Sequence, residues 1–207
     1  MQRIKRNRAY IMELILSLIF IMLLIGVFIN SGEGLNIDKF IFNNLILNIR
    51  CDVLTKFFKG ITFLSNPEFL VVLSVIIFIF LKGLKEKLCL VANISLVTLI
   101  NQGLKRIICR PRPDVIKLIK QGGYSFPSGH AMASTAFYGY LIYLIWKSNL
   151  NKTYKYIGTV MLLLLIFTIC FSRIYLGVHY ASDVLAGICL SSVLLIEFIR
   201  IIKKKEN

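Results

Sequence analysis

The sequence has no pair of cysteines at the short spacing of a metal or redox site. Its five cysteines are odd in number and scattered along the chain. Three of them lie inside apolar runs, where a free thiol behaves as a small apolar side chain. Pairing of the other two, Cys51 and Cys109, is left open. The sequence also shows no internal repeat and no low-complexity tract, and its 207 residues fit a single domain over 1–207.

Acidic residues are scarce, with 10 Asp and Glu against 25 Lys and Arg, so the formal net charge is +15. Such a charge is compatible with nucleic-acid binding, but the cations do not form one block. They cluster at the ends of apolar runs, a pattern typical of membrane topology. We therefore expect no nucleic-acid partner. Hydrophobic residues make up 57% of the chain, above the roughly 45–50% of soluble domains, which predicts an integral membrane protein.

Six apolar runs have about the 17–25 residues that a bilayer requires, or reach that length with their flanking residues. They lie at about 10–29, 68–81, 88–104, 128–146, 156–171 and 181–202. The first run follows a basic N-terminus, as in a secretory signal, but it is longer than a signal core and no cleavage site follows it. We expect a retained first span and an all-α, polytopic membrane protein with six transmembrane helices.

The segment 37–63 separates the first two spans and is mixed in character. Apolar residues recur in it at helical spacing, but Asp and Asn residues interrupt them. This mixture predicts short helices lying along the membrane interface. One long tilted span through the segment is the alternative.

The Lys and Arg residues predict the orientation. They are concentrated at the N-terminus, at 82–87, at 147–155 and in the C-terminal tail, so both termini are expected in the cytoplasm. The main exception is a cation-rich, proline-broken stretch at 105–130. In this topology the end of the third span, the start of the fourth and the turn between the fifth and sixth share the outer face.

The turn between the last two spans contains His179 and, four residues later, Asp183. If the last helix starts here, this spacing places both on one helical face. A carboxylate on one imidazole nitrogen fixes the tautomer and leaves the other nitrogen as a nucleophile or base. The alternative is a His–Asp pair that only caps a helix.

The start of the fourth span reads Pro127-Ser128-Gly129-His130. Proline and serine before an apolar run predict a helix start with Ser128 as N-cap. The N–H groups at a helix N-terminus attract anions, and Gly129 allows close approach. His130 would face the same position and could protonate a leaving oxygen. A plain membrane-helix cap is the alternative.

The third group of residues runs from Lys105 to Pro113. Arg112 lies between two prolines, which favours extended backbone. A rigid Arg fork and the point charge of Lys105 suit a phosphate dianion. We interpret Arg106 and Arg110 as cations that extend from the helix end to the membrane interface.

Taken together, the three groups predict a phosphoryl-transfer site that works by positioning and charge. The two histidines of the chain both fall within them. Asp114 and Asp183 are the only acids in these groups, which is fewer carboxylates than a two-metal site requires. We therefore expect no metal and no cofactor.

The three motifs, K-x6-R-P, P-S-G-H and S-R-x5-H-x3-D, resemble those of the type 2 phosphatidic-acid phosphatase family, with a motif-bearing core at about 55–200. The resemblance implies that His179 attacks phosphorus to form a phosphohistidine and that Asp183 orients it. It implies that His130 is the general acid and then the base that activates water. It also implies a phosphate cradle formed by Lys105, Arg112, Ser128, Gly129 and Arg173.

In a membrane protein this resemblance implies a lipid phosphatase at the outer membrane face, with the bilayer and a lipid phosphate as partners. Undecaprenyl diphosphate, phosphatidylglycerophosphate and phosphatidate all remain open as substrates, and the outward topology slightly favours the first. The compact chain and its Ile, Lys and Asn usage suggest a bacterial plasma membrane. The alternatives are a lipid phosphotransferase and a non-catalytic lipid-binding or transport protein.

Overall fold

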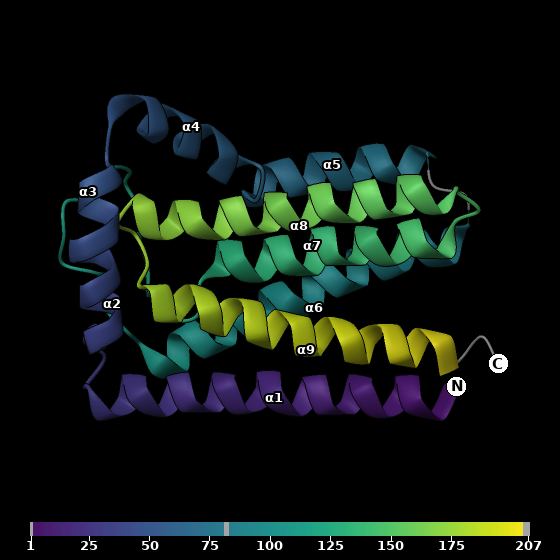
Figure 1. The fold of residues 1–207 in the computed structure, drawn as a ribbon, viewed down its shortest axis with the longest axis horizontal. Coiled ribbons are helices and arrows are strands. Elements are labelled where there is room, and N and C mark those ends of the chain that lie inside the picture. The colour runs from purple at the N-terminus through teal and green to yellow at the C-terminus, as the bar shows by residue number, and fades with distance from the viewer. Residues whose placement is uncertain (1, 81–82, 205–207) are drawn as a thin grey trace.

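The computed structural model describes residues 2–80 and 83–204, with side chains from residue 7 onward. Long helices run side by side as a bundle (Figure 1). They are α1 (Gln2–Ile29), α5 (Pro67–Phe80), α6 (Leu84–Ile108), α7 (Gly129–Lys147), α8 (Lys152–Tyr175) and α9 (Ala181–Lys204). Shorter elements are α2 (Asn36–Ile41), the π-helical turn η1 (Phe42–Ile46), α3 (Leu47–Ile49) and α4 (Asp52–Phe63).

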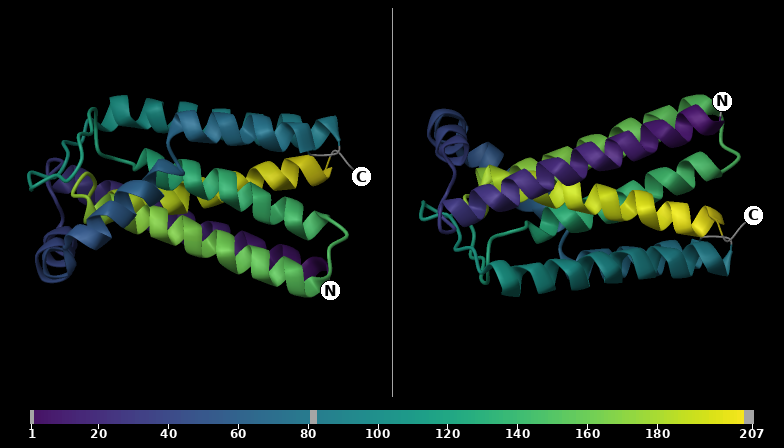
Figure 2. Two further views of the ribbon diagram at one scale, coloured as in Figure 1. Left: turned by 90° about the horizontal axis from the view of Figure 1, so that it is seen from above. Right: turned by 90° about the horizontal axis from the view of Figure 1, so that it is seen from below.

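Helix α7 lies at the centre of the bundle and packs against α6, α8 and α9. Its first half presents small or well-fitted side chains that are fully buried, including Ala131, Met132, Ala136 and Phe137. Small residues let neighbouring helices approach closely, which favours packing inside a membrane. Helix α1 packs against α9 on the outside of the bundle, as the right view of Figure 2 shows.

The outer faces of the long helices expose large apolar side chains. On α1 these include Leu14 and Met22, and on α8 they include Leu164 and Phe167, which is 65% exposed. Such continuous apolar surfaces are rare on soluble monomers and suit contact with lipid tails. The prediction of an all-α membrane protein is therefore confirmed.

Four helical segments are long and apolar enough to cross a bilayer: Asn7–Ile29, Leu84–Ile108, Lys152–Tyr175 and Ala181–Lys204. Helices α4 and α5, bent by 54° at a short break, form a fifth candidate if they are taken as one span. The structure thus supports four or five of the six expected spans. The expected second span ends at Leu81, which lies outside the described residues, as do Lys82 and Lys205 from the predicted basic clusters.

The segment between α1 and α5 does not form one long span, so that alternative is wrong. Helices α2 and α3 lie across one end of the bundle, and α4 then turns back alongside α8 (Figure 1). The helical path breaks at Arg50 and Cys51, both of which have extended backbone. This cap of short helices lies at the same end as the loop between α6 and α7, whereas α1 begins and α9 ends at the other end.

Candidate active site

The loop between α6 and α7 meets the turn between α8 and α9 at the capped end of the bundle. Because α6 and α8 end there and α7 and α9 begin there, residues far apart in the sequence come together. The structure brings together all eight candidate residues of the sequence. The cations come from the end of α6, the loop and the end of α8, and the histidines come from the start of α7 and the last turn.

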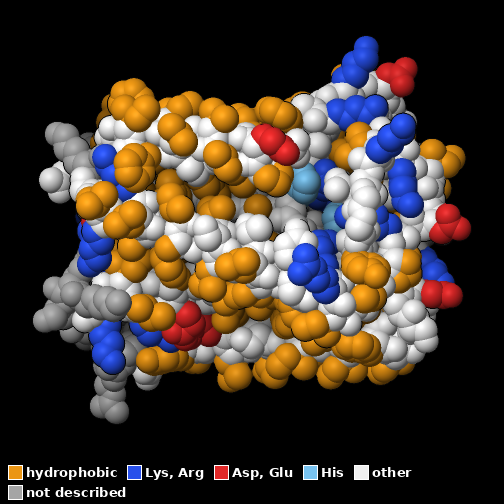
Figure 3. Space-filling model, turned by 180° about the vertical axis from the view of Figure 1, so that it is seen from behind, with side chains coloured by type: hydrophobic (Ala, Val, Ile, Leu, Met, Phe, Trp, Pro, Cys, Tyr) orange, Lys and Arg blue, Asp and Glu red, His pale blue; other side chains and the backbone are white. Residues whose placement is uncertain are grey.

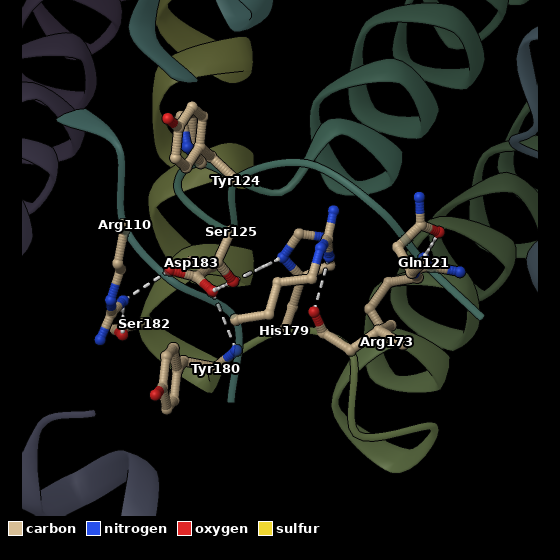
Figure 4. A network of polar contacts seen from close by, with 12 residues as sticks. Arg110, Gln121, Tyr124, Ser125, Arg173, His179, Tyr180, Ser182 and Asp183 are labelled. Carbon is tan, nitrogen blue, oxygen red and sulfur yellow. Dashed lines mark hydrogen bonds and ion pairs between the residues drawn. The ribbon is translucent and has the colours of Figure 1, made fainter. Parts of the chain in front are cut away.

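His179 and Asp183 lie close together, with Nδ1 of the imidazole 3.5 Å from Oδ2 of the carboxylate. A third residue, Ser125, lies between them (Figure 4). Its hydroxyl donates to Oδ2 of Asp183 at 2.5 Å and is 3.2 Å from Nδ1 of His179. If Nδ1 carries the proton and donates to Ser125, then Nε2 keeps its lone pair. In that tautomer a relay of two hydrogen bonds, from Nδ1 of His179 to Ser125 and from Ser125 to Oδ2 of Asp183, links the imidazole to the carboxylate.

Nε2 of His179 faces Arg112, whose Nη1 lies 3.1 Å away. Burial lowers the pKa of His179 well below its ordinary value, and the cations Arg112, Arg173 and Lys105 lower it further. A neutral imidazole with a free lone pair is the form that a nucleophile requires. Burial also lowers the pKa of Arg112, but a guanidinium starts so high that it keeps its charge.

The three cations are held by the backbone and by neighbouring side chains. Arg112 donates to the carbonyl oxygens of Gly122, Gly123 and Val178. Lys105 donates to the carbonyl oxygen of Tyr124 at 2.5 Å. These bonds fix the direction of the positive charge before any substrate arrives, which is the arrangement that electrostatic catalysis favours.

Arg173 is 1% exposed and donates from Nη1 to Thr62 Oγ1 at 2.6 Å and from Nη2 to Gln121 Oε1 at 2.7 Å. Its Nε is buried without a hydrogen-bond partner. Buried polar atoms are nearly always bonded, so an unpartnered donor beside other cations fits an anion as its acceptor.

Ser128 occupies the N-cap position of α7, as the sequence predicts, but its side chain does not bond to the helix backbone. Its Oγ is buried without a hydrogen-bond partner, so the hydroxyl remains available to a ligand. Gly129 lies so close to Asn101 that an added Cβ would be 3.1 Å from Oδ1 of that residue. His130 follows, and its Nε2 is 2.9 Å from Oδ1 of Asn66.

A cavity of about 1030 Å³ opens beside these residues. At one end it is lined by Lys105, Arg112, His130 and His179, and further along by apolar residues of α5 and α6 such as Val75 and Ile94. Figure 3 shows the hollow surface next to the histidines, with cations gathered around that end and apolar side chains along the helices. A charged end and an apolar groove match a ligand with an anionic head and a hydrocarbon tail.

Arg110 corrects one interpretation of the sequence. We predicted that it extends to the membrane interface, and this is wrong. Its side chain is 0% exposed and pairs with Asp183 at 2.5 Å and with Asp38 at 3.2 Å. Arg106, by contrast, is exposed. The reason for the difference is that α6 ends at Cys109, which has a left-handed backbone conformation, and the chain then turns so that Arg110 points inward.

The possible pairing of Cys51 and Cys109 is not present, since both have free thiols.

Ser125, Asn66, Asp38 and Arg110 were not among the candidates. Arg110 shares the Arg-Pro pattern of Arg112, which is a weak signal that it has a related role. The other three are ordinary polar residues outside the motifs. Across the described residues, no three His, Cys, Asp or Glu side chains are grouped so that they could hold a metal ion.

Comparison with known proteins agrees with this arrangement. The profile of the PAP2 superfamily matches residues 86–207. The chain is 33% identical over 187 residues to phosphatidylglycerophosphatase B of Bacillus subtilis (strain 168). This alignment covers 86% of this chain and 89% of the relative.

Two crystal structures have the same fold. The transmembrane PAP2-type phosphatidylglycerolphosphate phosphatase from Bacillus subtilis aligns with a TM-score of 0.82 and 29% identity, over 93% of this chain and 96% of that one. Aquifex aeolicus LpxE aligns with a TM-score of 0.66 and 29% identity, over 81% and 96%. The resemblance drawn from the three motifs is thereby confirmed: the chain belongs to the PAP2 superfamily and is a multi-pass membrane enzyme that hydrolyses lipid phosphates.

Proposed function

We propose that the substrate of this phosphatase is phosphatidylglycerophosphate. The observation that carries the proposal is the similarity to the Bacillus subtilis phosphatidylglycerophosphatase, which extends over nearly the full length of both chains. The charged end of the cavity accepts a phosphomonoester, and the apolar groove accepts acyl chains. Undecaprenyl diphosphate and phosphatidate share this combination of head and tail and are the competing substrates in the test below.

In the proposed complex the phosphate lies among Lys105, Arg112 and Arg173. The unpartnered Nε of Arg173 and hydroxyl of Ser128 would each donate to a phosphate oxygen. The N–H of Gly129, at the start of α7, would add a backbone donor and the favourable end of the helix dipole. Arg112 Nη1, which now faces Nε2 of His179, would donate to a phosphate oxygen and so leave the lone pair of Nε2 facing phosphorus.

The reaction then proceeds in two steps. Nε2 of His179 attacks phosphorus, an N–P bond forms, and the bond from phosphorus to the lipid oxygen breaks while His130 gives that oxygen a proton. In the second step His130 takes a proton from water, the water oxygen attacks phosphorus, and the N–P bond breaks. Inorganic phosphate leaves and His179 regains its lone pair. Ser125 and Asp183 hold the Nδ1 proton throughout and stabilise the positive charge that develops on the ring.

Asn66 gives His130 a defined orientation in this scheme. Its Oδ1 is an acceptor, so the proton of the neutral ring lies on Nε2 and the lone pair on Nδ1. In the first step the ring must carry a second proton, on Nδ1, which it gives to the leaving lipid oxygen; the lone pair left on Nδ1 then takes a proton from water in the second step. Asn66 lies at the bend between α4 and α5, so the helix that walls the groove also positions the general acid.

We further propose that the single domain crosses the membrane six times, with α7 and the α4–α5 pair as spans beside the four long helices. With 19 residues, α7 is about 28 Å long, close to the thickness of the hydrocarbon core. It lies alongside α8 and α9 in the bundle and runs antiparallel to α8 (Figure 1). The cations near the beginning of α1 and at the end of α9 favour a cytoplasmic position for both termini. The active site and the short helices α2 and α3 would then lie at the outer interface.

The decisive experiment is an assay of phosphate release by the purified protein in detergent, in the presence of EDTA, on the three lipids side by side. We expect the highest kcat/KM for phosphatidylglycerophosphate. A higher value for undecaprenyl diphosphate or phosphatidate would replace the substrate, and strict dependence on Mg²⁺ would overturn the metal-free mechanism. Release without an added acceptor also separates a hydrolase from a phosphotransferase.

The covalent step has its own test. His179→Ala should abolish turnover together with any acid-labile phosphoenzyme trapped from labelled substrate. A variant that keeps substantial turnover would refute the assignment of His179 as the nucleophile.

A further inference from the structure

Arg110 lies on the far side of Asp183 from His179, and no step of the reaction above uses it. All three of its guanidinium nitrogens donate hydrogen bonds. Nη1 donates to Asp183 Oδ1 at 2.5 Å and to Ser182 Oγ at 2.9 Å. Nη2 donates to Asp38 Oδ2 at 3.2 Å and to the carbonyl oxygen of Glu33, and Nε donates to the carbonyl oxygen of Gly32. The ring of Tyr180 lies 4.1 Å from its Cζ and adds a cation–π contact.

Asp38 belongs to helix α2, in the segment that carries no family motif. It is 4% exposed, and both of its carboxylate oxygens are bonded to the start of α9. Oδ1 accepts from the backbone N–H of Ser182 at 2.8 Å, and Oδ2 accepts from the hydroxyl of Ser182 at 2.7 Å and from Arg110. Asp38 thus binds both the guanidinium that contacts Asp183 and the residue that precedes Asp183 in the chain.

The two oxygens of Asp183 have separate partners. Oδ1 accepts from Arg110, whereas Oδ2 accepts from Ser125 and from the backbone N–H of Tyr180 and faces His179. Arg110 therefore fixes the rotation of the carboxylate and keeps Oδ2 directed at the relay (Figure 4). It is also the cation in contact with a carboxylate that is 0% exposed, and a buried charge without such a partner is strongly unfavourable.

We propose that Arg110, held in place by Asp38, is a positioning residue for the His179–Asp183 pair, and that helix α2 is thereby part of the active site. The inference rests on the proposed role of His179 as nucleophile. Asp38 fixes Arg110, Arg110 fixes Asp183, and Asp183 with Ser125 fixes the proton on Nδ1 of His179. A purely structural role, in which the Asp38–Arg110 pair only ties α2 to the bundle, would affect stability and leave the rate of the folded enzyme unchanged.

The test compares Asp38→Asn, Arg110→Lys and Arg110→Met in the full-length protein in detergent. The matched control is Glu13→Gln. Glu13 is 7% exposed and binds Arg200 through both carboxylate oxygens, so it joins α1 to α9 as Asp38 joins α2 to α9. The measurements are kcat and KM on whichever of the three lipids the wild-type protein hydrolyses, the inhibition constant of inorganic phosphate, and the thermal unfolding midpoint.

We expect Asp38→Asn to lower kcat about 10-fold and Arg110→Met about 100-fold, as when the outer partners of an oriented imidazole are removed. Arg110→Lys should fall between wild type and Arg110→Met because it keeps the charge but not the fork. KM and phosphate inhibition should change little, since the phosphate cradle is intact. The Asp38→Asn/Arg110→Met double variant should be no slower than Arg110→Met, because both changes break one chain of contacts.

Glu13→Gln should lower the unfolding midpoint and leave kcat unchanged. The inference is overturned if folded Asp38→Asn and Arg110→Lys keep kcat within about twofold of wild type, or if Glu13→Gln loses as much rate as Asp38→Asn. If Arg110→Met does not fold, the other two variants decide. A failure of the proposed reaction is visible separately, as turnover that survives His179→Ala.

Discussion

His179 lies with its imidazole buried between Asp183 on one side and the guanidinium of Arg112 on the other. Burial and the three nearby cations lower its pKa well below the ordinary value. The cations that would bind the phosphate thus also favour the neutral form of the proposed nucleophile before a substrate arrives. One set of charges can therefore serve both ground-state activation and transition-state stabilisation.

We expect the imidazole of His179 to remain neutral as the pH falls through about 6.5, where an ordinary histidine takes up a proton. NMR of the protein labelled at histidine can follow this in detergent micelles, because the chain has only two histidines and His130→Ala assigns the pair. Since the unfolded state binds the proton first, the stability of the fold should decline as the pH drops below about 6.5. A His179 signal that titrates near that pH in the folded protein would contradict the prediction.

Asn66 yields a second prediction at this scale. Asn66→Leu removes the acceptor for Nε2 of His130 and should lower kcat about 10-fold with little change in KM, because general acid–base catalysis depends on the orientation of the ring. Asn66→Asp keeps an oxygen at the same place and should retain more activity than Asn66→Leu. Equal activities of the two variants would show that the hydrogen bond has no catalytic role.

The motifs locate the groups that we propose to react, but they do not identify the residues that hold those groups in place. His179, Asp183 and the cations could be found from sequence because their types and spacing follow from the chemistry. Ser125, Asn66 and Asp38 could not, because a lone serine, asparagine or aspartate is common in loops and at helix ends, and its partner is known only from the fold. Arg110 was misjudged because a cation next to an apolar helix end normally reaches the interface.

At the scale of helices, α5 and α6 form the two walls of the apolar groove, and α7 closes its base near the histidines. The bend of 54° between α4 and α5 separates α5 from the cap and allows it to stand beside the groove. The groove-lining face of α5 carries exposed apolar residues such as Val71 and Val75, which are 63% and 56% exposed. This pair of helices is therefore the part of the fold suited to recognise the lipid tail.

Filling the groove should impair long lipids selectively. Val75→Trp places a bulky ring between α5 and α6. We expect it to lower kcat/KM for a long-chain lipid phosphate about 10-fold, because the lipid would lose about one to two kcal/mol of apolar contact. A short-chain, water-soluble analogue should be hydrolysed almost as before. Val160→Trp on the outer face of α8, where the valine is 53% exposed, is the matched control and should leave both rates unchanged. Equal losses on both substrates would place the tail elsewhere.

The sequence also predicted helices better than it predicted spans. The apolar runs at 88–104 and 156–171 lie inside α6 and α8, which extend further at each end through polar residues that still favour helix. The run at 128–146 corresponds to α7, but this helix is rich in small and polar residues because it packs against other helices on several sides. Hydropathy reflects how well the surface of a helix suits lipid. A helix at the centre of a bundle contacts mainly other helices, so its mean hydropathy can be low.

At the scale of the whole molecule, the candidate active site lies at one end of the bundle and the chain termini at the other. The loop between α6 and α7, the short helices and the turn before α9 gather at one end, whereas α1 begins and α9 ends at the other (Figures 1 and 2). In the proposed topology, the site at the end of the bundle would lie at the height of the lipid headgroups, and the groove that runs from it would lie at the height of the lipid tails. A lipid could then bind without leaving its leaflet.

The orientation of this bundle gives the last prediction. In a chain carrying Cys51→Ser and Cys109→Ser, which removes the exposed thiols near the site, Lys120→Cys should react with an impermeant maleimide from outside intact cells. Asn149→Cys, in the exposed turn between α7 and α8 at the opposite end, should react only after the cells are opened. The reason is that the cations concentrated at that second end favour a cytoplasmic position for it. The reverse labelling pattern would place the active site on the cytoplasmic leaflet and would restrict the substrate to lipids found there.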